Sequence, residues 1–123
     1  MKRTAWIALT FAGLVIAAAS GAADDMVEIR LTGRYYSEPA TVRITVAVEP
    51  AAENRRLVIE ADSERYFRSS ALMLDGEKEK RLHSVEFKSL PAGAYVLRAE
   101  VRSLDDVLAM VQEDLVVTGT GGR

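Results

Sequence analysis

Alternation of apolar and polar residues over long stretches is the feature that most constrains this sequence. In residues 42–48 and 95–101 every second side chain is apolar, and most of those between are charged or polar. Side chains on a β-strand point alternately to its two sides, so each such segment has one face for a core and one for solvent. Similar patterns occur at 27–32, 56–61 and 84–88. The sequence therefore predicts antiparallel sheets that are covered on one side.

A sixth segment, residues 66–74, alternates less regularly. Phe67 lies on one parity, whereas Leu72 and Leu74 lie on the other. A β-bulge adds one residue to a strand and reverses its parity. The pattern predicts a strand with a bulge near residues 69–70, followed by a turn at Asp75-Gly76.

The segment 104–115 is open to two interpretations. Its apolar residues follow helical spacing, and Ser103 with Asp106 matches the start of a helix. The alternative is a hairpin turn at Asp105-Asp106 and a last strand over 107–118, broken around 112–114. We favour the strand, because an open sandwich needs a last strand to pair its edge.

These segments add up to about seven strands within about 100 residues. We expect an all-β fold, a single immunoglobulin-like antiparallel β-sandwich over residues 24–118. The glycine-rich residues 119–123 are expected to form a disordered tail.

The first 23 residues have the composition of a secretory signal. Lys2 and Arg3 precede an uncharged apolar run over 5–19, and small residues fill 20–23. This order of regions predicts a signal-peptide helix that is cleaved after Ala23. We expect a periplasmic or secreted protein. The alternative is an uncleaved segment that anchors the chain in the inner membrane.

Charge limits the kinds of partner that we expect, and cysteine content limits how the core can be held together. Removing Lys2 and Arg3 from the 16 basic residues leaves 14 against 18 acidic ones. A domain with this acidic excess has no basic surface for phosphates, so we expect no nucleic-acid partner. The sequence has no cysteine, so its core must be held without disulfides.

The segment from Leu90 to Tyr95 resembles a known structural motif. Its residues read L-P-A-G-A-Y, similar to the corner of fibronectin type III-like and carboxypeptidase-regulatory-like domains. The resemblance implies that the Tyr95 ring enters the core and its hydroxyl bonds an upstream backbone group. In this motif Pro91 restricts one turn dihedral, and Gly93 permits a positive φ.

Few residues are suited to catalysis or metal binding. His83 is the one histidine, and we interpret it as a residue at the rim of a strand. Glu60, Asp62 and Glu64 alternate at a strand end and are the best candidates for calcium, but we interpret them as a solvated strand end. We therefore expect no cofactor, no metal site and no enzymatic activity.

Exposed tyrosines offer the best candidate contact patch, formed by Tyr35, Tyr36 and Tyr66. Together with the expected export, they suggest a non-enzymatic binding or accessory domain. It would act through loops or a sheet edge on another envelope or extracellular protein. The alternative is a small-ligand carrier for calcium or carbohydrate.

Overall fold

The computed structural model describes residues 26–119, which form a two-layered, nearly all-β structure. The prediction of an all-β fold is therefore confirmed. The expected signal segment and most of the expected tail lie outside the described residues. Within residues 26–119, no helix is long and apolar enough to cross a membrane. In chain order the elements are β1 (Val27–Arg30), β2 (Tyr35–Ser37), β3 (Ala40–Val48), β4 (Arg56–Asp62), β5 (Phe67–Met73), the 3-10 helix η1 (Gly76–Lys78), β6 (Leu82–Leu90), β7 (Gly93–Arg102) and β8 (Val107–Thr118).

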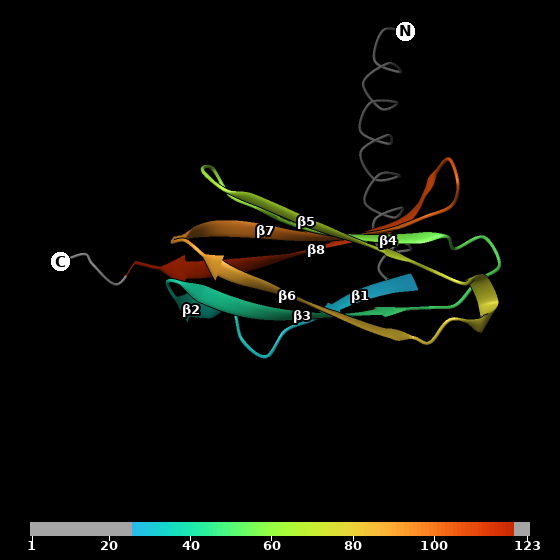
Figure 1. Cartoon of the computed structure of the whole chain (residues 1–123), viewed down its shortest axis with the longest axis horizontal. Coiled ribbons are helices and arrows are strands. Elements are labelled where there is room, and N and C mark those ends of the chain that lie inside the picture. The colour runs from blue at the N-terminus through green and yellow to red at the C-terminus, as the bar shows by residue number, and fades with distance from the viewer. Residues whose placement is uncertain (1–25, 120–123) are drawn as a thin grey trace, which may run out of the picture.

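The strands form two sheets that face each other (Figure 1). The three-stranded sheet has the order β1-β3-β6, and the five-stranded sheet has the order β2-β8-β7-β4-β5. All pairs are antiparallel except β2 with β8, where Tyr35 lies opposite Val116 in a parallel ladder. The described residues contain eight strands where about seven were expected. The extra strand is β2, whose three residues are too few to show a repeating pattern.

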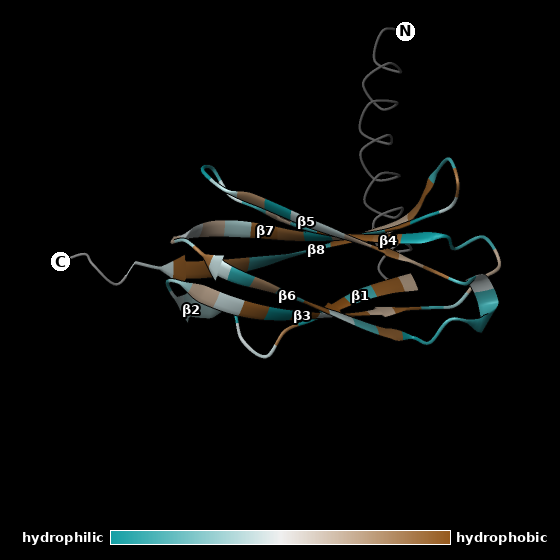
Figure 2. Cartoon of the chain, viewed as in Figure 1, coloured by the Kyte–Doolittle hydropathy of each residue, from teal (hydrophilic) through white to brown (hydrophobic). Residues whose placement is uncertain are grey.

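The core lies between the two sheets and is filled by the apolar parity of each strand. Val42, Ile44 and Val46 of β3 are fully buried, as are Ile59 of β4 and Leu97 of β7. Hydrophobic and hydrophilic residues alternate along the ribbons in Figure 2. Each large apolar side chain removed from water contributes about 1.5–3 kcal/mol.

Residues 107–118 form one continuous strand, β8, so the preference for a strand over a helix is confirmed. The expected break around 112–114 is absent, because β8 pairs with β7 throughout that region. In the turn before it, Ser103 N–H donates to the carbonyl oxygen of Asp106 (2.9 Å), and Ser103 Oγ accepts from Asp106 N–H (3.0 Å). Ser103 and Asp106, whose spacing matches a helix cap, therefore close a hairpin turn.

The bulge predicted near residues 69–70 is wrong. β5 pairs with β4 residue by residue without a shift in register, from Met73 opposite Arg56 to Phe67 opposite Asp62. Phe67 points to the outer face of the sheet and is not part of the core. Leu72, on the other parity, packs against the core.

Candidate functional site

The free edge of β5 is the surface of the described chain that most needs a partner. β5 is the last strand of its sheet and pairs only with β4. On its outer face, Phe67 and Met73 are 54% and 79% exposed at the two ends of the strand. Ser69 and Ala71 are exposed between them. A long strand edge with unpaired backbone groups and no charge on its open face is a template for pairing with another strand.

The other edges in the described part of the chain are shorter or charged. β1 has four residues, with Glu28 and Arg30 on its outer side, and β2 has three residues. The part of β8 that extends beyond β2 carries Asp114 on its outer parity. β6 is long but carries Glu86 and Lys88 on its outer parity. Because short strands and charged side chains are the devices by which proteins prevent edge pairing, β5 has the least protection among these edges.

The only charged residue of β5 is turned away from the outer face. Arg68 donates to the carbonyl oxygen of Lys88 (3.1 Å) and to the Tyr66 hydroxyl (3.3 Å). Its guanidinium also lies over the ring of Phe87, 5.4 Å from the centroid. These contacts hold β5 against β6 of the opposite sheet. The outer face of β5 therefore carries no charge, and the strand is attached to the opposite sheet through Arg68.

Two ion pairs lie on the outer face of the sheet beside β5. Arg98 of β7 pairs with Glu60 of β4 (2.7 Å), and Arg102 pairs with Glu100 (3.0 Å). The Arg98–Glu60 pair is partly buried, with side chains 26% and 24% exposed. Glu60 therefore already has a cationic partner on the outer face.

The predicted tyrosine patch is spread over the five-stranded sheet. Tyr35 on β2 is 78% exposed. Tyr36 and Tyr66 are partly buried and pack against the core. Tyr66 precedes β5, and strands β8 and β7 lie between β2 and β4. A shared role of the three residues stays a prediction.

At the predicted corner, the Tyr95 hydroxyl donates to the carbonyl oxygen of Pro91 (2.7 Å). The Tyr95 side chain and Leu90 are buried, and burial raises the pKa of the Tyr95 hydroxyl above its ordinary value. The positive φ expected at Gly93 is absent there, and Ser89 has it instead, with φ of 62°. Gly93 begins β7 close to Ser63, and a Cβ atom added to this glycine would lie 3.5 Å from the Ser63 Cβ.

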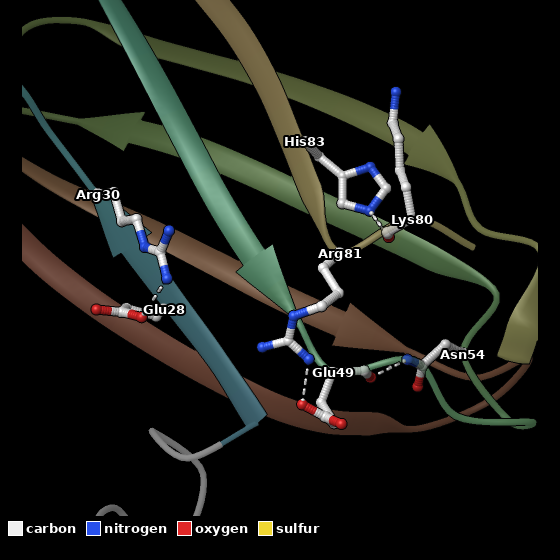
Figure 3. A network of polar contacts seen from close by, with 7 residues as sticks. All are labelled: Glu28, Arg30, Glu49, Asn54, Lys80, Arg81 and His83. Carbon is white, nitrogen blue, oxygen red and sulfur yellow. Dashed lines mark hydrogen bonds and ion pairs between the residues drawn. The ribbon is translucent and has the colours of Figure 1, made fainter. Parts of the chain in front are cut away.

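His83 is buried on the inner parity of β6, opposite Val46. Its Nε2 lies 3.0 Å from the carbonyl oxygen of Lys80 (Figure 3). Nearby, Arg81 pairs with Glu49 (2.6 Å). His83 is therefore near the start of its strand, as expected, but its side chain is buried and does not lie at an exposed rim. Within residues 26–119, no three His, Cys, Asp or Glu side chains are grouped to hold a metal ion, the Glu60–Asp62–Glu64 set included.

The β5 edge was not identified from the sequence. The available signal was the absence of acidic and lysine residues from 67 to 73, together with Phe67 on the wrong parity for the core. Which strand lies at an edge depends on the order of strands in the sheet, which alternation does not reveal.

No protein-family model matches the chain, and no curated protein sequence matches it. Among solved structures, it is similar to a superoxide reductase (neelaredoxin) from Ignicoccus hospitalis. The TM-score is 0.55 at 12% sequence identity, over 75% of this chain and 79% of the other. At this identity the similarity shows the arrangement of strands.

The comparison contradicts two expectations from the sequence. The resemblance to fibronectin type III-like and carboxypeptidase-regulatory-like domains is wrong as a family assignment, because a solved structure that the chain matches is a superoxide reductase and no family model supports the resemblance. A six-residue corner is a local feature that different sandwiches can share. The inference of a non-enzymatic accessory domain or ligand carrier is also contradicted, because this strand arrangement occurs in an enzyme.

The described residues do not fit the chemistry that the name of that neighbour states. One-electron reduction of superoxide needs a redox-active centre, and transition metals in proteins are held by histidine, cysteine or carboxylate groups. This chain has one histidine and no cysteine. Residues 26–119 group no three such ligands. The similarity between this chain and the superoxide reductase is therefore one of fold.

Proposed function

We propose that this chain is a self-associating subunit, in which copies join through the free edge of β5. The observation that carries the proposal is a seven-residue edge strand whose outer face is uncharged and exposes Phe67 and Met73. Pairing with a second strand would satisfy the open backbone N–H and C=O groups of β5. It would also remove two large apolar side chains from water.

The rigidity of β5 supports association of folded copies. An edge strand that must first be ordered would lose conformational entropy when it binds. β5 is already paired with β4 along its whole length and is held to β6 by Arg68. Its open edge is therefore prepared for a second strand.

We also propose that the chain is exported, with residues 1–23 removed as a signal peptide. The support is the order of basic, apolar and small residues before Asp24. Intact-mass analysis of the protein from the cell envelope and medium tests this, with a mature N-terminus at Asp24 as the expected result. An uncleaved chain that stays with the inner membrane would overturn cleavage and favour the anchor.

Sedimentation velocity tests the self-association. The protein concentration should be about 100 µM, which is high enough to populate a dimer with a small and weak interface. Under these conditions the protein should sediment with twice the mass of one chain. The double variant Ser69→Lys/Ala71→Lys places charge on the open face of β5 and should sediment as a monomer. A wild type that stays monomeric, or a β5 variant that stays dimeric, would refute the proposal.

The control is Met110→Lys/Gln112→Lys, which adds the same charge two residues apart on β8. Met110 and Gln112 are exposed on the outer face of the same sheet, but β7 and β4 lie between β8 and β5. The control should remain dimeric. Thermal unfolding of both variants at low concentration checks that each is folded.

A further inference from the structure

This inference rests on the proposed self-association and specifies its geometry. We infer that two copies pair their β5 strands antiparallel about a two-fold axis at Ser70. The two five-stranded sheets then form one continuous sheet. The register follows from strand parity, exposed side chains and charge.

Parity restricts the possible registers. If two sheets are to continue into one another, outer residues of one β5 must lie opposite outer residues of the other. This requires the axis to pass through a residue and not between two residues. Of the axes that remain, only the one at Ser70, the middle residue of Phe67–Met73, pairs all seven residues of both strands.

The Ser70 axis brings the two large exposed side chains together. Phe67 and Met73 each lie three residues from Ser70. Phe67 of one copy is then directly opposite Met73 of the second copy, and the contact occurs twice. Sulfur–aromatic contacts are favourable, and the small Ser69 and Ala71 fill the positions between them. On the inner face, Arg68 lies opposite Leu72 of the second copy, which its methylene groups can cover.

Charges beyond the strand ends match in the same register. Arg65 and Asp75 each lie five residues from Ser70, and both are exposed. Neither belongs to an ion pair among the described residues. The two-fold axis places Arg65 of one copy beside Asp75 of the other, at both ends of the interface. An axis two residues away in either direction loses this match.

Disulfide trapping tests the register, because the chain has no cysteine of its own. Residues directly opposite in an antiparallel pair have Cα atoms about 4.5–5.5 Å apart, within reach of a disulfide. Ser70→Cys should therefore form a covalent dimer under mild oxidation. Ser69→Cys alone should not, because its two copies are offset by about 8 Å. Ser69→Cys mixed with Ala71→Cys should cross-link.

The outcomes separate this inference from the proposed function. A non-covalent dimer in which Ser70→Cys does not cross-link, or in which Ser69→Cys alone does, overturns the register and leaves self-association standing. A protein that is monomeric by sedimentation overturns both.

A charge exchange gives an independent test. Arg65→Glu should weaken the dimer about fivefold, since two exposed ion pairs are lost together. Asp75→Arg should have a similar effect. The double variant Arg65→Glu/Asp75→Arg should restore the wild-type affinity. If the double variant is as weak as either single variant, Arg65 and Asp75 do not meet.

Discussion

Replacing Tyr95 by Phe should lower the free energy of unfolding by about 1 kcal/mol. The substitution keeps the ring, which is 1% exposed, and removes only the hydroxyl that donates to Pro91 at 2.7 Å. A net hydrogen bond is worth about 0.5–1.5 kcal/mol, and a fully buried acceptor left without a donor costs more. Pro91 is only half-buried, so water can partly replace the lost donor. The expected loss is therefore moderate.

Urea unfolding followed by circular dichroism measures this loss. The measurement is best made in the Ser69→Lys/Ala71→Lys background, because association would make the apparent stability depend on concentration. A loss of about 1 kcal/mol corresponds to a decrease in Tm of about 4–8 °C for a domain of this size. Tyr95→Ala should cost about 3–5 kcal/mol, because it also leaves a cavity.

Tyr35→Phe is the matched control, since it removes the same atom from a residue that is 78% exposed. Its effect should stay within about 0.5 kcal/mol. If Tyr95→Phe is as neutral as Tyr35→Phe, the Tyr95–Pro91 bond does not stabilise the fold and the reasoning fails.

The same corner and the opposite end of the sandwich give three further predictions. Ser89→Gly should raise stability by about 1 kcal/mol in urea unfolding, because glycine adopts the φ of 62° without steric strain; an unchanged midpoint would contradict this. The raised pKa of Tyr95 means that its contribution to stability is complete below the ordinary pKa of 10.0 and decreases as pH rises toward the folded-state value. Unfolding measured between about pH 9 and 11 should accordingly show a steeper loss for wild type than for Tyr95→Phe, and parallel curves would count against it. Asn54→Asp should cost at least about 2 kcal/mol, because the buried Asn54 amide donates to the Glu49 carbonyl oxygen (3.0 Å) and a carboxylate cannot; equal urea midpoints for Asn54→Asp and wild type would show that this bond is dispensable.

Much of the fold could be predicted because it depends on local alternation. Strands such as β3 and β7 bury one parity against the opposite sheet, and that parity is visible in the residues themselves. The parity of Phe67 indicates a bulge only if every large apolar residue belongs to the core. Phe67 is instead on the open face of an edge strand.

The candidate site was harder to predict because it is defined by strand order. Residue type alone singles out the tyrosines, but Tyr35 is on β2 and Tyr66 precedes β5, and strands β8, β7 and β4 lie between β2 and β5. The free edge exists only because β5 comes last in its sheet. Similarly, the family resemblance rested on a short corner, whereas structural similarity reports the path of the whole chain.

The sequence by itself determined that this chain forms one-sided strands and a core without disulfides, because alternation and the lack of cysteine are properties of the residues alone. Residues 103–108 mark the limit of this local information. The Asp106 N–H donates to Ser103 Oγ here as it would at a helix start, and only pairing with β7 made the following residues a strand. The tertiary structure also decided that β5 has one neighbour and an open side. Neighbours in a sheet are set by contacts between residues far apart in the chain, which no local pattern records.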